Sequence, residues 1–373
     1  MVTPYTPPKD KYLVAILGAT GSVGQKFIEL LQTHPWFEIA ALCASERSSG
    51  KPYRQAARWF MQTPLSQRLG NMVVHECDPQ KVSQLFGNYD GPKIVFSGLD
   101  ASVAGEIESE FAESGFYVIS NSKNHRWDSD VPLIIPEINA HHLDLIKKQK
   151  TFSRGGAIIT NPNCSTIGLA MALKPLDDQF GVEAVNVTTL QALSGAGYPG
   201  VPSLDIIDNV VPFIGGEEEK VEQEPRKILG QYKDGVLQEF TAKISAQCNR
   251  VAVLDGHLEC VQVKLKNKPT MQQMIAAWEK FRGVPQELDL YMAPQQPIHY
   301  LHEENYPQPK LHRMADKGMA VSVGRLRPCN LFDYKFVILS HNTIRGAAGG
   351  TILIAELLLK NNVLKTIGIH DKQ

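Results

Sequence analysis

A glycine-rich turn, Gly18 to Gly24, joins a compact apolar segment at residues 11–17 to an amphipathic segment at residues 23–32. The spacing of the apolar residues predicts a strand followed by a helix that ends before Pro35. Strand, glycine turn and helix in this order open a Rossmann unit, because the glycines let the backbone approach a pyrophosphate at the helix N-terminus. The chain is therefore expected to begin with a dinucleotide-binding domain.

The segments that follow continue the β/α alternation. We expect strands at residues 38–44, 93–97 and 117–120, and a helix at residues 101–114. Such alternation is typical of a parallel sheet covered by helices. In this context a dinucleotide site is favoured over a merely tight turn.

The seven residues after the second expected strand bear on the choice of cofactor. They contain two cations, Arg47 and Lys51, three serines, Ser45, Ser48 and Ser49, and one acid, Glu46. An NAD-specific domain usually offers an acid to the ribose, whereas a 2′-phosphate is a dianion that a guanidinium binds with two hydrogen bonds. The segment favours NADP, and the alternative is a solvated polar loop.

The second half of the chain changes its pattern. Four segments with β-branched or alternating character predict strands, at residues 185–193, 251–265, 319–324 and 334–340. Several of these segments follow one another without a full helix between them. This indicates a mixed sheet in a second domain. The sequence thus predicts an α/β protein with a Rossmann-type domain at residues 1–160, a catalytic α+β domain at residues 161–342 and a C-terminal helix from residue 343 onward.

Composition excludes several classes of protein. The 373 residues carry a net charge of −1 and no long Lys/Arg run, which argues against a nucleic-acid partner and favours a small-molecule substrate. No apolar stretch is long enough for a membrane span, and the first ten residues lack the apolar core of a signal peptide. The six cysteines form no Cys-x-x-Cys pair, so we expect free thiols, no metal site and a cytoplasmic protein.

One of these cysteines, Cys164, is placed for chemistry. An apolar run at residues 157–160 ends in the turn Asn161-Pro162-Asn163, and a helix-like stretch at residues 165–173 begins directly after Cys164. Unpaired N–H groups and the helix dipole stabilise a thiolate at a helix N-terminus. The residue is expected to be a nucleophile, and the alternative is a small buried apolar side chain.

A cysteine nucleophile beside a nicotinamide implies acyl chemistry, in which a thioester forms and hydride reduces it to an aldehyde. Such a site needs an acid or base and a cation for anionic substrate groups. Arg250 and His257 are candidates, but seven positions apart they would face opposite sides of one uninterrupted strand. We expect Asp255-Gly256 to supply a turn or bulge that redirects the imidazole.

Several strings together resemble one enzyme family. From residue 11 to about residue 359 the chain resembles aspartate-β-semialdehyde dehydrogenases. The strings that carry the resemblance are Gly-Ala-Thr-Gly-Ser-Val-Gly, Asn-Pro-Asn-Cys-Ser-Thr, Ser-Gly-Ala-Gly, Arg-x6-His and Asn-x-x-Arg-Gly-Ala-Ala-Gly. The resemblance implies NADPH-dependent reduction of L-4-aspartyl phosphate to aspartate semialdehyde with release of phosphate. This step leads toward threonine, methionine and, in some organisms, lysine.

The resemblance also implies roles for residues of the second domain. Cys164 matches the nucleophile, His257 matches the acid/base, and Gln191 matches a residue that orients the substrate. Arg250 matches the ligand of the substrate α-carboxylate, Glu224 matches the ligand of its α-amino group, and Lys227 matches a phosphate ligand. Glu224 and Lys227 share a helical face, although their charge-rich segment could also be a solvated helix, and Lys220 is a less favoured substitute for Lys227.

For the cofactor, the resemblance implies a pyrophosphate loop, a later turn, a loop beside the nicotinamide and a ligand of its amide. These are Gly18, Thr20, Gly21, Ser22 and Val23; Ser97 and Gly98; Ser194, Gly195 and Gly197; and Asn342. The resemblance also implies that the C-terminal helix returns to the Rossmann domain.

The chain departs from the pattern of bacterial members at residues 98–102, where no Arg or Lys follows the strand. The turn at residues 121–126 and the string Glu217-Glu218-Glu219-Lys220 are instead similar to the archaeal and fungal branch. Asn121, Ser122 and Lys123 are therefore candidates for binding the substrate phosphate.

Two alternatives remain open at this stage. Malonyl-CoA reductase is a relative that uses a similar cysteine but releases coenzyme A, and redox-sensing regulators that do not catalyse also contain Gly-Ala-Thr-Gly loops. For assembly, the resemblance implies a homodimer, sometimes paired into a homotetramer. We expect the apolar segments at residues 205–214 and 334–339 to form the contact.

Overall fold

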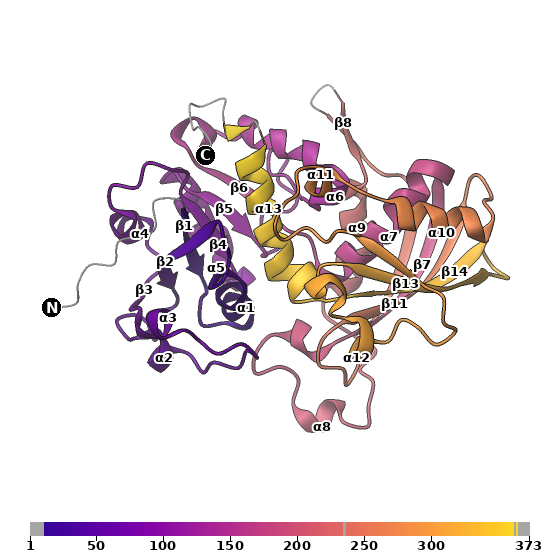
Figure 1. Ribbon diagram of the computed structural model, residues 1–373, viewed down its shortest axis with the longest axis horizontal. Coiled ribbons are helices and arrows are strands. Elements are labelled where there is room, and N and C mark those ends of the chain that lie inside the picture. Colours follow the sequence, from indigo (N-terminus) through magenta and orange to yellow (C-terminus); the bar gives the residue numbers. More distant parts are fainter. Residues whose placement is uncertain (1–10, 234–235, 362, 365–373) are drawn as a thin grey trace. The chain divides into compact units, whose positions relative to one another are not determined.

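The computed structural model describes residues 11–233, 236–361 and 363–364, which form two compact units (Figure 1). Unit 1 lies within residues 1–132, 143–161 and 354–373, and unit 2 comprises residues 133–142 and 162–353. No helix in the described part of the chain is long and apolar enough to cross a membrane.

Unit 1 is built on a parallel six-stranded sheet with strand order β3-β2-β1-β4-β5-β6. Its strands are β1 (Tyr12–Leu17), β2 (Phe37–Cys43), β3 (Val74–His75), β4 (Ile94–Ser97), β5 (Tyr117–Ser120) and β6 (Ala157–Thr160). Because both faces of a parallel sheet are covered by helices, these strands are almost entirely buried. Parallel strands end at the same edge, so the turns after β1, β4 and β5 lie close together.

The expected turn after β1 leads into α1 (Ser22–Leu31). Gly18 has a φ of +74°, which L side chains rarely adopt, and a Cβ on Gly18 would lie 2.7 Å from the carbonyl oxygen of Gly98. A Cβ on Gly24 would lie 2.1 Å from the carbonyl oxygen of Gly18. The glycines therefore let strand, turn and helix pack backbone against backbone, and the Tyr53 hydroxyl, which donates to the carbonyl of Ala19 at 2.8 Å, braces the turn.

Unit 2 contains a mixed six-stranded sheet with strand order β10-β7-β11-β14-β13-β12. Its strands are β7 (Val182–Gln191), β10 (Lys243–Arg250), β11 (His257–Leu265), β12 (Ile298–Leu301), β13 (Val321–Pro328) and β14 (Tyr334–Ser340). Helix α7 (Cys164–Phe180) packs on this sheet through a run of buried apolar side chains, and Trp278 of α10 (Met271–Lys280) donates to the carbonyl of Ala172 at 2.9 Å. The thiol at the start of α7 therefore rests on a rigid core.

The remaining elements connect these layers. They are α2 (Tyr53–Ala56), α3 (Gln67–Asn71), α4 (Pro79–Phe86), α5 (Ala101–Glu113), α6 (Pro136–Asn139), α8 (Ser203–Ile206), α9 (Glu217–Ile228), α11 (Val284–Glu287), α12 (Pro309–His312), α13 (Gly349–Lys360), the hairpin β8 (Gln231–Lys233) and β9 (Val236–Gln238), and short 3-10 turns at residues 140–148, 152–154, 193–196 and 315–318. A π-helical turn, Ile344–Ala348, precedes α13.

The predicted fold class is confirmed, and one predicted strand is wrong. Residues 251–265 are not one strand, because Arg250 ends β10 and His257 begins β11, with residues 251–256 as the connection. This connection contains Gly256 at a φ of +96°, so the turn expected at Asp255-Gly256 is present but joins two strands. The C-terminal helix expected from residue 343 begins as a π-helical turn at Ile344.

The compact units follow the expected domains closely but not at every boundary. Residues 133–142 group with unit 2, and α13 is divided at residues 353 and 354. The part of the expected C-terminal helix at residues 365–373 lies outside the described residues. The domain boundaries at residues 160 and 342 stay a prediction.

Candidate active site

Asn163 sets the start of α7 and so the position of Cys164. Its side-chain oxygen accepts hydrogen bonds from the backbone N–H groups of Ser165 at 3.0 Å and Thr166 at 3.2 Å. The cap thus uses two of the amides that were expected to face the thiolate, and what remains at Cys164 is the positive end of the helix dipole. Cys164 is the first residue of α7 and is partly exposed.

Cys164 faces His257 at the start of β11. The thiol sulfur lies 3.2 Å from Nε2 of the imidazole. The other ring nitrogen, Nδ1, accepts the backbone N–H of Ala192 at 3.0 Å, so Nδ1 carries no proton. The neutral ring therefore carries its proton on Nε2 and donates it toward sulfur.

His257 is completely buried, and burial together with the positive charge of Arg250 lowers the pKa of its ring to about 3. The accepted amide at Nδ1 has the same effect, because the imidazolium would need a proton there. At neutral pH the ring is a neutral hydrogen-bond donor and not the cation of an ion pair.

The register of the sheet in unit 2 brings the predicted residues into one row. Arg250 at the end of β10 is paired with Gln191 at the end of β7, and His257 is paired with Ser340 of β14. Leu190 of β7 pairs with Leu258 of β11, so the same register brings Gln191 opposite His257. The ends of three strands thus bring Gln191, Arg250 and His257 to one edge, and His257 faces Cys164 in the first turn of α7 there.

The loop after β7 closes over this row. A Cβ on Gly195 would lie 2.9 Å from Nη1 of Arg250 and 3.2 Å from Nε2 of His257. Nη1 of Arg250 also donates to the carbonyl of Ala192 at 2.7 Å, which fixes the guanidinium in the site. Of the predicted cofactor residues, Gly195 therefore contacts the same groups as the predicted substrate residues.

A second glycine lies against the nucleophile itself. A Cβ on Gly346, in the π-helical turn, would lie 2.7 Å from the Cβ of Cys164 and 3.0 Å from its Cα. The neighbouring Arg345 anchors this turn through a buried pair of hydrogen bonds to Glu137, at 2.6 and 2.5 Å. The motif at residues 342–349 thus places backbone beside the thiol.

Glu217 is a member of the site that sequence reasoning did not single out. Its carboxylate accepts from the side chains of Asn163 at 2.9 and 3.0 Å, Gln191 at 3.2 Å and Lys220 at 2.6 Å. Burial opposes its ionisation, but the Lys220 ammonium and these hydrogen bonds outweigh burial, so the pKa of Glu217 lies below its ordinary value. The buried positions 217, 221, 224 and 228 of α9 follow a helical spacing, and this spacing in the sequence could have indicated that Glu217 lies on the buried face of the helix.

Glu224 and Lys227 are buried, so the alternative of a solvated helix face is wrong for them. Glu224 is 1% exposed and accepts the backbone N–H of Asn163 at 2.7 Å, and Lys227 is 3% exposed. Glu224 thus holds the turn before Cys164, whereas Glu217 is the acid that contacts Gln191. Their roles toward the substrate stay predictions.

Asn342 and Ser194 lie together, as their shared assignment to the nicotinamide predicts. The Asn342 amide nitrogen donates to Oγ of Ser194 at 2.8 Å, and its oxygen accepts the backbone N–H of Gly256 at 2.8 Å. Gly197, with a φ of +73°, turns the chain away after this contact.

The remaining predicted residues belong to unit 1. Gly18, Thr20, Gly21, Ser22 and Val23 form the turn into α1, Gly98 follows β4, and Ser45, Arg47 and Ser48 follow β2 in a mostly exposed loop. Gly21, which caps α1, has no side chain to bond the first amides of the helix, so this end fits a phosphate. The Ser97 hydroxyl is fully buried and donates to Glu108, and the predicted place of Ser97 in the cofactor site stays a prediction.

Asn121 and Ser122 follow β5 at the same edge of the sheet as Gly98. Oδ1 of Asn121 accepts from the side chain of Asn161 at 3.1 Å, and the Ser122 hydroxyl donates to Oδ1 of Asn124 at 2.5 Å. Lys123, between them and Asn124, is exposed. The turn is thus held by Asn161, which follows β6, and by its own Asn124.

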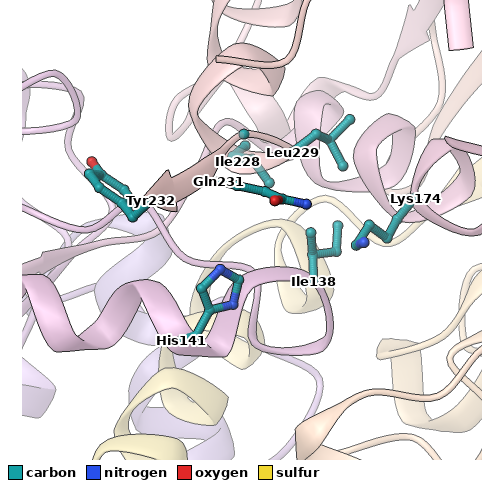
Figure 2. A pocket seen from close by; sticks show the side chains of 8 residues that line it. Ile138, His141, Lys174, Ile228, Leu229, Gln231 and Tyr232 are labelled. Carbon is teal, nitrogen blue, oxygen red and sulfur yellow. The ribbon is translucent and has the colours of Figure 1, made fainter. Parts of the chain in front are cut away.

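A hollow of about 180 Å³ lies elsewhere in unit 2 (Figure 2). It is lined by Ile138, His141, Lys174, Ile228, Leu229, Gly230, Gln231 and Tyr232. None of these lining residues is a predicted site residue. Among the described residues no group of three or more His, Cys, Asp or Glu side chains could hold a metal ion.

Comparison with known proteins identifies the family. The model of the semialdehyde dehydrogenase NAD-binding domain matches residues 13–146, and that of the semialdehyde dehydrogenase dimerisation domain matches residues 173–345. The chain is 49% identical to the aspartate-semialdehyde dehydrogenase of Schizosaccharomyces pombe, over 94% of this chain and 99% of that protein. The chain belongs to the aspartate-semialdehyde dehydrogenase family.

Two further relatives agree. The chain is 48% identical to the aspartate-semialdehyde dehydrogenase of Methanothermobacter thermautotrophicus, over 92% of this chain and 98% of that protein. The crystal structure of the Candida albicans aspartate-semialdehyde dehydrogenase with NADP superposes with a TM-score of 0.84 at 45% identity, covering 93% of this chain and 98% of that chain. The predicted likeness to archaeal and fungal members of the aspartate-semialdehyde dehydrogenases is confirmed.

The Gly346 contact generates a prediction. Gly346→Ala is expected to push Cys164 away from His257 and to lower the kcat of this dehydrogenase by at least roughly tenfold, because small displacements of reacting groups are costly. Steady-state kinetics measure the effect. Gly215→Ala is the control, because a Cβ there meets no atom within 4 Å. Equal kcat values for both variants would contradict the tight fit.

The protonation of His257 generates a second prediction. Because the folded pKa is about 3 and the unfolded value is near 6.5, the ring stays neutral in the folded protein throughout the neutral range. A profile of kcat/KM against pH is therefore expected to show no ionisation of His257 near pH 6.5. A change of slope near pH 6.5 in the wild-type profile that is absent from the profile of His257→Gln would contradict this prediction. The ring's contribution to folding stability is lost as the pH falls from about 6.5 toward 3.

Proposed function

We propose that this protein catalyses NADPH-dependent reductive dephosphorylation of L-4-aspartyl phosphate to L-aspartate 4-semialdehyde through a thioester on Cys164. The observation that carries the proposal is the thiol at the start of α7, 3.2 Å from the donating nitrogen of His257. Membership of the aspartate-semialdehyde dehydrogenase family supplies the reaction class.

In the first half-reaction the Cys164 thiolate attacks the acyl carbon and forms a C–S bond. The C–O bond to phosphate then breaks, the electron pair leaves with phosphate, and a thioester remains. The helix dipole and the Nε2–H of His257 stabilise sulfur as thiolate before the attack and after its release. The same N–H is the nearest donor for an oxyanion that develops on the carbon bonded to sulfur.

The second half-reaction needs a hydride, which bound NADPH supplies. When the aldehyde forms, the C–S bond breaks and its electron pair returns to sulfur, so Cys164 is again a thiolate that His257 stabilises. Gly195 and Ser194 border the site from the loop after β7, and Asn342, which donates to Ser194, borders it from the segment after β14. Small residues there leave room for a planar ring.

Charged residues around the row suit an amino-acid substrate. Arg250 offers a guanidinium to the α-carboxylate, and Gln191 orients the chain near sulfur. Glu217 or Glu224 offers the acid for the α-amino group, and the lower exposure of Glu224 favours Glu217. We assign phosphate binding to Lys227, Asn121 and Ser122, with Lys220 as the substitute for Lys227.

The cofactor site that we propose is the edge of the sheet in unit 1. The backbone N–H groups at the start of α1 donate to the pyrophosphate, and the loop with Ser45, Arg47 and Ser48 binds the 2′-phosphate. The approach of Gly18 to Gly98 fits a bound dinucleotide, since neither residue places a side chain on this edge.

Neither alternative is favoured. The relatives described above are named aspartate-semialdehyde dehydrogenases. A non-catalytic NADP sensor would have no need for Cys164, His257, Arg250 and Gln191 in one row.

For assembly we propose a homodimer, with the tetramer as its paired form. Leu204, Ile207, Val210 and Phe213 are 52–90% exposed, which is unusual for large apolar side chains of one segment. The other segment expected at the contact, residues 334–339, lies largely in the core of its own unit. The six free thiols favour a reducing compartment, the cytoplasm.

The central test is Cys164→Ser. Phosphate-dependent reduction of NADP by aspartate semialdehyde is expected to be lost while the fold and NADPH binding persist, because a serine hydroxyl is a far weaker nucleophile than a thiolate. Cys260→Ser is the matched control, since Cys260 is an exposed free thiol on β11. Full activity of Cys164→Ser would overturn the mechanism.

The cofactor assignment is tested by Arg47→Ala. The variant is expected to bind NADPH more weakly and NADH with nearly unchanged affinity, because only NADPH carries the 2′-phosphate. Fluorescence titration with both cofactors measures this. An equal loss for both would assign Arg47 to the structure of the loop.

The dimer is tested by a charge on the exposed apolar segment. Phe213→Glu combined with Leu204→Glu is expected to shift the mass in light scattering toward the monomer, because ionised side chains would be buried in the contact. Leu331→Glu serves as the control, since Leu331 is 83% exposed on another segment. An active wild-type monomer at micromolar concentration would refute the assembly.

A further inference from the structure

Glu108 is a buried acid that the proposed mechanism does not use. It lies on α5 in unit 1, is 0% exposed, and its Oε1 accepts hydrogen bonds from the hydroxyls of Ser97 and Ser120, each at 2.6 Å. Ser97 ends β4, Ser120 ends β5, and the two serines are register partners in the sheet. One carboxylate oxygen therefore ties together the carboxyl ends of two neighbouring strands.

The tie continues into the turn after β5. Oγ of Ser120, which donates to Glu108, also accepts the backbone N–H of Ser122 at 2.9 Å. The backbone N–H of Asn121 donates to the carbonyl of Ser97 at 3.1 Å. Ser122 is thus held by the Ser120 hydroxyl and Asn121 by the Ser97 carbonyl, and these are the two serines whose hydroxyls Glu108 binds.

The second carboxylate oxygen of Glu108 faces positive charge. Oε2 has no hydrogen-bond partner among the described residues, and it lies 3.9 Å from Nε2 of His125. Nε2 of His125 is 3.1 Å from the carbonyl of Gly105 and Nδ1 is 2.8 Å from Asp128, so both ring nitrogens face acceptors. Both ring nitrogens of His125 are thus within hydrogen-bond distance of an oxygen acceptor.

Charge and burial oppose one another at Glu108. Burial raises the pKa of Glu108, whereas the hydrogen bonds from Ser120 and Ser97 and the charges of His125 and Arg126 act against this rise. Arg126 also donates to the carbonyl of Asn121 at 2.8 Å, so the turn is held from both ends. An acid buried at such cost is expected to have a specific task.

We propose that Glu108 is a positioning residue, which fixes the turns after β4 and β5 so that Gly98, Asn121 and Ser122 can bind phosphate groups. This inference rests on the proposed function, because that function assigns these turns to the cofactor and to the substrate phosphate. Glu108 itself touches neither ligand. It acts through the hydroxyls of Ser97 and Ser120.

The test compares Glu108→Ala with Glu108→Gln in the full-length protein. Phosphate-dependent reduction of NADP gives kcat and the KM for inorganic phosphate, and fluorescence titration gives the Kd for NADPH. Glu108→Ala removes the acceptor of both hydroxyls and is expected to raise the KM and the Kd by roughly tenfold with little change in kcat. Glu108→Gln keeps an oxygen acceptor and is expected to restore most of both affinities.

A double-mutant cycle separates positioning from general damage. Ser120→Ala breaks the same chain of hydrogen bonds, so Ser120→Ala and Glu108→Ala are expected to be strongly non-additive in the KM for phosphate. Glu110→Ala is the matched control, because Glu110 is an exposed acid on the same helix. Glu110→Ala is expected to behave as wild type.

Three results would overturn the proposal. The first is an unchanged KM for phosphate and an unchanged Kd for NADPH in Glu108→Ala despite a lower melting temperature. The second is a loss in Glu108→Ala that is confined to kcat. The third is that the effects of Glu108→Ala and Ser120→Ala on the KM for phosphate are additive. If Glu108→Ala does not fold, Glu108→Gln and Ser120→Ala carry the comparison, and wild-type affinities in Ser120→Ala would then overturn it. Failure of the proposed function is distinguishable, because wild type itself would then show no phosphate-dependent activity.

Discussion

The active-site arrangement depends on one contact, between the sulfur of Cys164 and Nε2 of His257 at 3.2 Å. Its chemistry follows from a neighbouring backbone group, since the N–H of Ala192 occupies Nδ1 and thereby places the proton on Nε2. Burial and the charge of Arg250 keep the ring neutral. The pair is therefore a thiol with a fixed neutral donor beside it.

Buried acids support this contact from the side of α7. Glu224 holds the backbone of Asn163, Glu217 holds its side chain, and Asn163 in turn caps the helix that begins with Cys164. Glu217 also accepts from Gln191 and from the Lys220 ammonium, which offsets the cost of burying its charge. The helix α9, which reads as a charged surface in the sequence, is thus a support of the nucleophile.

Glycines allow backbone segments and site groups to approach closely in both units. Gly346 lies against Cys164 and Gly195 against His257 and Arg250, whereas Gly18 and Gly24 bring strand and helix together in unit 1. At each of these positions a single Cβ would meet backbone or a site group within about 3 Å. In both units the glycine motifs of the sequence therefore mark places where backbone packs against backbone or against reacting groups.

The sequence by itself determined the opening Rossmann unit, the nucleophile and the family, because these depend on short-range spacing: a strand, a glycine turn and a helix, or a cysteine between a turn and a helix. Only the tertiary structure decided that Arg250 and His257 belong to two strands, that Glu217 contacts Gln191, and that the Ser97 hydroxyl points to Glu108. These facts depend on sheet register and on which helix face is buried. Both are set by long-range packing, which the local pattern of residues does not contain.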